Sequence, residues 1–179
     1  ISFLKLIDNY QGMKMKLTSI ISFIIALFIV SCSQKSPEEK LTGDYLGQQL
    51  PGDEPALFAP ELVSTAKFER DMAITPDGSE IYYSVILGKF DYTMIMVVKR
   101  KNGVWGNPEV AEFSGNPNWK DLEPFISPDG EKLYFMSTRT DTANGETEPG
   151  DEDIWVVNRI DNGWSEPYNL GEPVSSDKE

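Results

Sequence analysis

Short apolar runs recur along the chain at fixed places around a turn motif. The stretch MAITPDGSEIYYSV at 72–85 closely resembles PFISPDGEKLYFMS at 124–137, and their Asp-Gly pairs, at 77–78 and 129–130, lie 52 residues apart. In each stretch proline sets φ for a tight turn, aspartate suits the next position, and glycine takes the left-handed position that follows. Each stretch therefore predicts a β-hairpin.

The repeat continues downstream of both hairpins. MIMVVKRKNGVWGNP at 94–108 matches DIWVVNRIDNGWSEP at 153–167, and the second copy has seven more residues before this point, in the acidic stretch 138–153. Each unit thus predicts a third strand, an Asn-Gly turn and a weaker fourth strand, EVAEF at 109–113 or PYNLG at 167–171. Four short strands in a unit of about 50 to 60 residues are typical of a β-propeller blade.

Two architectures use strands of this kind. The runs IMVV and LYFM are almost continuously apolar, which indicates strands buried on both faces, as in stacked blades. A sandwich built from four hairpins has similar strands. The return of one motif at one place in each unit favours the propeller. The sequence therefore predicts an all-β fold with about two four-stranded β-propeller blades.

The second copy of the repeat carries a family resemblance. ISPDGEKLYFMS with the later DIWVV resembles the WD-repeat-like propeller repeat of the TolB type, which occurs in periplasmic and surface lipoproteins of bacteria. The match is good at 127–137 and 153–157 and less complete at 75–84, where Thr75 replaces serine and Glu80 replaces lysine. The lead-in YLGQQLPGDEPALFAPELVST also resembles lead-ins of this family. The resemblance implies a fold and says nothing about activity.

The N-terminal region has the features of a secretory signal peptide at 13–31. The basic residues Lys14 and Lys16 precede an apolar run at 17–30 and the small residue Ser31. The apolar run is shorter than the roughly 20 residues that a membrane-spanning helix needs. A cleaved leader is therefore expected.

Residues 29–32, Ile-Val-Ser-Cys, resemble the bacterial lipobox, in which the cysteine becomes the first residue of the mature protein and carries the lipid. This resemblance implies lipid attachment at Cys32 and a membrane as partner through that anchor. An ordinary signal peptide with an incidental cysteine, and an uncleaved anchor, are the alternatives. Ser33 after the cysteine favours the outer membrane of the bacterial cell envelope, by similarity to sorting rules in some bacteria.

The predicted organisation follows from these features. The stretch 172–179 resembles 61–69, which precedes the first hairpin, and two blades cannot close a ring that needs about four. We therefore expect a fragment of a longer chain. Its predicted segments are an upstream stretch (1–12), the signal peptide (13–31), an acylated cysteine with a flexible tether (32–54), and propeller repeats (55–179) that comprise a blade-completing strand (55–65), repeat one (66–116), repeat two (117–176) and the start of a third (177–179).

The composition excludes several functions for the chain as given. Its 16 basic and 29 acidic residues give a net charge of −13, which repels nucleic-acid backbones. The absence of histidine excludes Ser-His-Asp and Cys-His catalysis and the histidine-based zinc sites. We expect no nucleic-acid partner, no metal and no cofactor.

Two pairs of carboxylates are the main candidates for ligand binding. Glu69 and Asp71 align with Asp121 and Glu123, each pair two residues apart and just before the predicted innermost strand. Near the mouth of a propeller channel, such carboxylates could hold a cation or a basic or sugar ligand. The alternative is that they satisfy backbone donors and neighbouring cations such as Arg70.

Several aromatic and acidic residues are weaker candidates. Tyr92 and Trp119 have no counterpart in the other repeat, which favours a role in surface recognition. Trp105 and Trp164 occur at matching positions, which favours structural packing. The acidic loop at 141–153 has oxygen ligands suited to calcium but lacks EF-hand spacing, so a solvated loop is expected.

These features favour a non-catalytic function. The first hypothesis is a lipid-anchored cell-envelope β-propeller that binds a protein or a glycan. The alternative is a fragment of an envelope hydrolase, cleaving glycans or peptides, whose catalytic residues lie mostly outside this chain. A propeller fused to a peptidoglycan-binding or peptidase domain is a third possibility.

Overall fold

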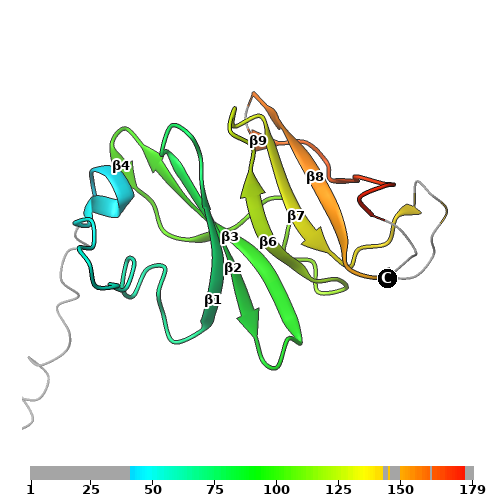
Figure 1. The fold of residues 1–179 in the computed structure, drawn as a ribbon, viewed down its shortest axis with the longest axis horizontal. Helices are drawn as coiled ribbons and strands as arrows, with labels where there is room; N and C mark the ends of the chain where they lie inside the picture. Colours follow the sequence, from blue (N-terminus) through cyan, green and yellow to red (C-terminus); the bar gives the residue numbers. More distant parts are fainter. Residues whose placement is uncertain (1–40, 143–144, 146–149, 162, 176–179) are drawn as a thin grey trace, which may run out of the picture. The chain divides into compact units, whose positions relative to one another are not determined.

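The computed structural model describes residues 41–142, 145, 150–161 and 163–175 (Figure 1). The upstream stretch, the predicted signal peptide, Cys32 and the start of a third repeat at 177–179 lie outside the described residues. The described residues form two antiparallel sheets, which confirms the prediction of an all-β fold. Among them, no helix has both the length and the apolar character needed to cross a bilayer.

Each repeat forms one five-stranded sheet. In the first sheet, β1 (Phe68–Ile74), β2 (Glu80–Leu87) and β3 (Tyr92–Lys101) pair in order, and the short strands β4 (Val104–Trp105) and β5 (Glu109–Val110) both pair with β3. In the second sheet, β6 (Asp121–Ile126), β7 (Lys132–Ser137) and β8 (Asp153–Ile160) pair in order, and β9 (Gly163–Trp164) and β10 (Tyr168–Asn169) both pair with β8. The four strands predicted in each repeat are present, and the short strands β4 and β9 each add a fifth.

The two Pro-Asp-Gly turns have the same geometry. The residue that opens each motif donates its hydroxyl to the aspartate two positions later, from Thr75 to Asp77 over 2.7 Å and from Ser127 to Asp129 over 2.5 Å. These hydrogen bonds are the main cause of the lowered pKa of both carboxyl groups. The glycines that follow have φ of 64° and 75°, the left-handed conformation that the turn requires.

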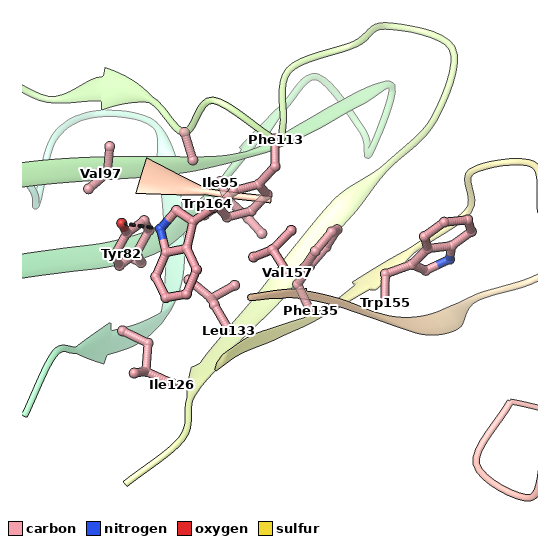
Figure 2. Packing of buried hydrophobic residues seen from close by; sticks show 11 residues of the cluster. Tyr82, Ile95, Val97, Phe113, Ile126, Leu133, Phe135, Trp155, Val157 and Trp164 are labelled. Carbon is pink, nitrogen blue, oxygen red and sulfur yellow. Dashed lines mark hydrogen bonds between the residues drawn. The ribbon is translucent and has the colours of Figure 1, made fainter. Parts of the chain in front are cut away.

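Two buried clusters hold the sheets in place. We call the first the inter-sheet cluster, because it joins both sheets (Figure 2). It consists of Tyr82, Ile95, Val97, Ala111, Phe113, Ile126, Leu133, Phe135, Trp155, Val157 and Trp164. The second, the lead-in cluster, joins the first sheet to the segment before β1. It consists of Leu46, Ala59, Val63, Ile81, Tyr83, Val85, Val98 and Trp105.

Equivalent residues of the two repeats face in the same direction. Ile81 corresponds to Leu133, and Tyr82 corresponds to Tyr134. Ile81 belongs to the lead-in cluster and so faces the segment that precedes its sheet, whereas Tyr82 faces the second sheet. Leu133 belongs to the inter-sheet cluster and so also faces what precedes it (Figure 2). The two sheets therefore stack head to tail.

The strands differ in how fully they are covered. On β3, in the run at 95–98 predicted to be buried on both faces, Ile95, Val97 and Val98 are buried and Met96 is partly buried. β2 is buried along most of its length on both faces. On β7, Leu133, Phe135 and Ser137 are buried, while the alternate residues Tyr134 and Met136 are partly exposed. The prediction of burial on both faces is therefore wrong for β7, because in the described part of the chain its Tyr134 side is only partly covered.

The repeated tryptophans join each sheet to the element before it. Trp164 donates its indole N–H to the hydroxyl of Tyr82 over 2.7 Å, and Trp105 donates its own to a backbone carbonyl of the lead-in over 2.8 Å. The guanidinium of Arg159 lies 3.8 Å from the ring centre of Trp164, and that of Arg100 lies 5.4 Å from that of Trp105. Both tryptophans are 5% exposed, so the packing role predicted for them is confirmed.

The start of the folded unit differs from the predicted tether at 32–54. Leu46, in the single turn η1 (Asp44–Gly47), is 2% exposed and packs in the lead-in cluster. The backbone N–H of Trp105 donates to the carbonyl of Leu41 over 2.9 Å. Residues 41–47 are therefore part of the folded unit, because Leu46 buries apolar surface and β4 supplies a partner for the backbone.

The blade-completing strand predicted at 55–65 is not formed. Ala59 and Glu61 have positive φ, 42° and 68°, which breaks an extended backbone, and Pro60 between them forms a lone bridge with Ser64. The apolar residues that suggested a strand, such as Val63 at 5% exposure, instead pack under the first sheet. This segment is an irregular turn that Ala59 and Val63 anchor to the first sheet.

We expect Tyr82→Phe to destabilise the protein by about 1–3 kcal/mol, because the buried N–H of Trp164 would lose its acceptor. Tyr92→Phe is the matched control, since Tyr92 is 53% exposed and should change stability by less than about 0.5 kcal/mol. Chemical denaturation of both variants measures the difference. Equal stabilities would contradict the role of this contact.

Candidate functional site

The edge strands β1 and β6 contain a β-bulge at the same place in the repeat. The pairing register shifts after Arg70 on β1 and after Leu122 on β6. The residues that follow, Asp71 and Glu123, have φ of 53° and 56°. Non-glycine residues seldom adopt this left-handed conformation. Since the feature occurs in both sheets, it belongs to the repeat.

The local sequence explains the bulge better in the second sheet than in the first. Pro124 lies within β6 and has no N–H to give to a strand ladder, so it fits best at a bulge or an edge. The equivalent position in β1 is Met72, which carries no such signal. The N–H of Glu123, turned out of the ladder, donates to the hydroxyl of Ser84 over 2.9 Å. Ser84 is fully buried on β2, so this bulge docks the second sheet onto the first.

The two bulges bring two of the predicted carboxylates to one guanidinium. Arg70 Nε lies 2.5 Å from Asp71 Oδ2, and Arg70 Nη2 lies 3.0 Å from Glu123 Oε1. The hydrogen bond with Asp71 is the main cause of a raised pKa at Arg70, so the guanidinium stays charged. The three side chains are 37%, 25% and 50% exposed, in the order Arg70, Asp71, Glu123. We call these three residues the bulge site. It faces solvent and has a formal charge of −1.

Energetic magnitudes indicate that stability alone does not explain the bulge site. A left-handed non-glycine residue costs on the order of 1–3 kcal/mol. An exposed ion pair returns roughly 0–1 kcal/mol. Strained backbone of this kind concentrates at functional sites, and bulges often redirect side chains there. The bulge site is therefore the candidate functional site.

Asp121, also a predicted ligand-binding residue, lies instead at the centre of a buried polar cluster. Its Oδ1 accepts hydrogen bonds from Arg139 Nη2 over 2.6 Å and from the hydroxyl of Ser137 over 2.7 Å. Its Oδ2 accepts one from the hydroxyl of Ser114 over 2.8 Å. Asp121 is fully buried and Arg139 is 8% exposed, so this pair is structural.

The first repeat has no such cluster because its residues differ. Arg139 corresponds to Leu87, and the place of Asp121 is taken by Glu69. Glu69 accepts hydrogen bonds from the backbone N–H and the hydroxyl of Thr65, so it fixes the turn before β1. Partners within the fold thus account for Asp121 and Glu69. The pairing of Asp71 and Glu123 with Arg70 is likewise the contact that the alternative interpretation names.

The two aromatic candidates have different surroundings. The guanidinium of Arg139 lies 5.3 Å from the ring centre of Trp119. Among the described residues, the buried indole N–H of Trp119 has no hydrogen-bond partner. Trp119 thus covers the buried arginine. Tyr92 is 53% exposed at the start of β3. Of the two, Tyr92 is available at the surface.

The acidic loop at 141–153 is described only in part, since residues 143–144 and 146–149 lie outside the described residues. Asp141, at its start, is 4% exposed. In the described ranges, no group of three or more His, Cys, Asp or Glu side chains is arranged to hold a metal ion.

Comparison of the chain with protein-family models, with curated proteins and with solved structures finds no match. The bulge site, with Arg70 as a member that the sequence analysis treated only as a neighbouring cation, is therefore the basis for inferring function.

We expect Asp121→Asn to cost about 3–5 kcal/mol, because it leaves the charge of Arg139 buried without its partner. Glu69→Gln, at the equivalent position of the first repeat, is the control and should cost less than about 1 kcal/mol, since Glu69 is partly exposed. Urea denaturation compares the two. If Glu69→Gln lowers the free energy of unfolding as much as Asp121→Asn, the carboxylate has the same structural role in both repeats, and the prediction is contradicted.

Proposed function

We propose that the two sheets are consecutive blades of a β-propeller with the TolB-type repeat. The head-to-tail stacking of Ile81 and Leu133 supports this, because a radial array requires each sheet to turn the same face to its predecessor. A two-sheet sandwich of equivalent hairpins would instead bring equivalent faces together. The tryptophan contacts, which link each sheet to the element before it, repeat in the same sense.

We propose that this module binds a protein or a glycan through the bulge site. The observation that carries the proposal is that two strained carboxylate positions, Asp71 and Glu123, recur in the repeat and meet at Arg70. In a propeller, the strands equivalent to β1 and β6 lie next to the central channel, so the bulges project toward it. A ring of blades presents such groups together.

The charge of the site indicates the chemistry of the ligand. Two carboxylates and one guanidinium leave an excess negative charge, in a chain whose net charge is −13. This arrangement favours an ammonium or guanidinium group on the ligand. Phe68, three residues before Asp71, is 58% exposed and adds an aromatic surface on which the apolar face of a sugar can pack.

The same geometry supports binding over hydrolysis. Glycoside hydrolysis needs one protonated and one ionised carboxyl group on either side of the scissile bond. At the bulge site the guanidinium of Arg70 lies between Asp71 and Glu123 and pairs with both. The guanidinium therefore occupies the space between the two carboxylates that the scissile bond of a substrate would need.

We propose that the module is held on a membrane of the bacterial cell envelope, the outer membrane by preference, through a lipid on Cys32. The lipobox-like residues 29–32 and the preceding apolar run support this. An anchored binding module that catalyses nothing by itself is consistent with a chain without histidine.

We expect the double variant Asp71→Asn, Glu123→Gln to bind cationic probes at least tenfold more weakly than the unchanged chain, because charged hydrogen bonds each contribute about 1.5–3 kcal/mol. Pentalysine and a short chitosan oligomer are the probes, so that the two arms separate a peptide from a sugar carrying the same ammonium groups. Isothermal titration calorimetry measures both.

The matched control is Glu131→Gln, Glu166→Gln, which changes the charge equally at two exposed positions of the second repeat. It should leave the affinity for either probe within about twofold. An equal loss in this control, or no binding of either probe to a folded chain, would refute the bulge site as the binding site.

We expect Cys32→Ala to abolish labelling of the chain by an alkyne analogue of palmitate in a bacterial host and to release the protein from the membrane fraction. Click detection on a gel and fractionation measure the two effects. Persistent labelling of the alanine variant, or an unlabelled native chain, would contradict the anchor.

A further inference from the structure

The hairpin of β8 with β9 docks on the first sheet through a tryptophan and an arginine. Trp164 donates its indole N–H to the hydroxyl of Tyr82 (Figure 2). Arg159, whose guanidinium lies over the ring of Trp164, donates from Nη2 to Glu80 Oε2 over 2.8 Å. Tyr82 in turn donates its hydroxyl to the same carboxylate over 2.9 Å. The hairpin thus needs an acceptor for the indole and a carboxylate for the guanidinium.

The hairpin of β3 with β4 docks on the lead-in through the same two contacts. Trp105 donates to the carbonyl of Gly43, and Arg100 donates from Nη1 to Asp44 Oδ1 over 2.8 Å. The preceding element is a strand in one case and a short turn in the other, so the two backbones differ. Because an acceptor and a carboxylate occur together on both, this pair of contacts is how a hairpin of this kind, here called a tryptophan hairpin, recognises the element before it.

The second sheet keeps the acceptor but reverses the charge. Tyr134 corresponds to Tyr82, and Lys132 corresponds to Glu80. Nζ of Lys132 donates to the neutral Oδ1 of Asn158 over 2.7 Å. In the described part of the chain, the hydroxyl of Tyr134 makes no hydrogen bond. A tryptophan hairpin that docks here meets an available hydroxyl beside an ammonium group.

The other polar positions of the interface do not determine the charge of what docks. Asp77 and Asp129 lie at equivalent places, and each accepts the hydroxyl hydrogen bond of its own turn, so they do not distinguish the two sheets. Ser84, which accepts the N–H of a bulge, corresponds to Met136, which has no hydroxyl. The polar contact that both sheets can make is therefore the one with the tryptophan hairpin.

The apolar part of this face of the second sheet is exposed. Phe125, which is paired with Tyr134, is 60% exposed, whereas its counterpart Ala73 packs against the inter-sheet cluster. Leu170 is 38% exposed, whereas its counterpart Ala111 is 2% exposed. In the first repeat, the next sheet of the repeat covers the equivalent face. The occupant that the structure itself shows for a face of this kind is therefore another such sheet.

We propose that the face formed by Phe125, Lys132, Tyr134 and Leu170 docks a further sheet of this repeat type whose tryptophan hairpin carries aspartate or glutamate at the position of Arg159. Its indole donates to the hydroxyl of Tyr134, and its carboxylate pairs with Lys132. Like charges at this contact exclude a sheet that carries arginine there. The inference rests on the proposed function, since it takes the further sheet to be a propeller blade, and adds what selects that blade.

A second copy of this chain does not meet the requirement. Both of its tryptophan hairpins carry arginine, and both are already docked, Arg100 on Asp44 and Arg159 on Glu80. Lys132 would face a guanidinium in either case. The reversed charge therefore also opposes end-to-end association of identical chains.

The experiment fuses a copy of residues 117–175 to the C-terminal end of the full chain, which supplies a further sheet. Four fusions are compared: the appended copy is unchanged or carries Arg159→Glu, and the original chain is unchanged or carries Lys132→Glu. Either single change joins opposite charges at the new contact, whereas no change and both changes join like charges. Urea denaturation of the four fusions forms a double-mutant cycle. Nuclear Overhauser contacts report the docked geometry.

We expect a coupling of about tenfold or more in the unfolding equilibrium constant, in favour of opposite charges, because charged hydrogen bonds are strong where solvent is largely excluded. In the equivalent contact, the side chains of Arg159 and Glu80 are 27% and 15% exposed. In both opposite-charge fusions, the indole N–H of the appended Trp164 should show contacts to the ring of Tyr134.

Lys101→Glu in the original chain is the matched control, since Lys101 is exposed on β3 of the first sheet. Combined with Arg159→Glu in the appended copy, it should show a coupling below about twofold. A coupling as large as that of Lys132 would mean that the overall charge, and not this contact, governs stability, and would overturn the inference.

Two further outcomes separate the inference from the proposed function. If the appended Trp164 contacts Tyr134 in all four fusions without coupling, the sheets stack as proposed but Lys132 selects nothing, so only the inference fails. If the contact is present in none of the four, a further sheet does not dock on this face, and the inference fails together with the proposed stacking of blades.

Discussion

The contact between the Tyr82 side of the first sheet and the Leu133 side of the second is the constraint on which the rest of the structure depends. It buries the inter-sheet cluster, in which each fully covered large side chain contributes on the order of 1.5–3 kcal/mol. It also sets β6 beside β1 and β2, where the N–H of Glu123 meets Ser84. If β6 did not lie beside β1 and β2 in this way, the carboxylates of the two bulges would not meet at Arg70.

The bulge site and the buried pair of Asp121 and Arg139 show how two neighbouring positions of the repeat serve two purposes. The pair is enclosed, and its partners satisfy it, so it holds the second sheet together. Asp71 and Glu123 are partly exposed and sit on strained backbone that their ion pairs with Arg70 do not offset. A ligand that contacts them would supply the missing stabilisation.

The sequence predicts the hairpins because their turn chemistry is local: Ser127 or Thr75, proline, aspartate and glycine act within a few residues. It does not predict the bulges, since a bulge keeps the apolar pattern and only Pro124 hints at one. It overstates the equivalence of Glu69 and Asp121, because the difference arises from Arg139, far along the chain. The sequence does not predict the turn at 55–65 for a similar reason: apolar residues such as Ala59 and Val63 do not by themselves separate a strand from a packed turn.

The central claim is that the sheets stack head to tail, and nuclear Overhauser contacts in the labelled chain test it most directly. The account predicts strong contacts from the indole N–H of Trp164 to the ring of Tyr82, together with contacts from the amide of Glu123 to the β-protons of Ser84. Contacts between the rings of Tyr82 and Tyr134, with none from Trp164 to Tyr82, would mean that equivalent faces meet. That result would contradict the stacking and, with it, the bulge site.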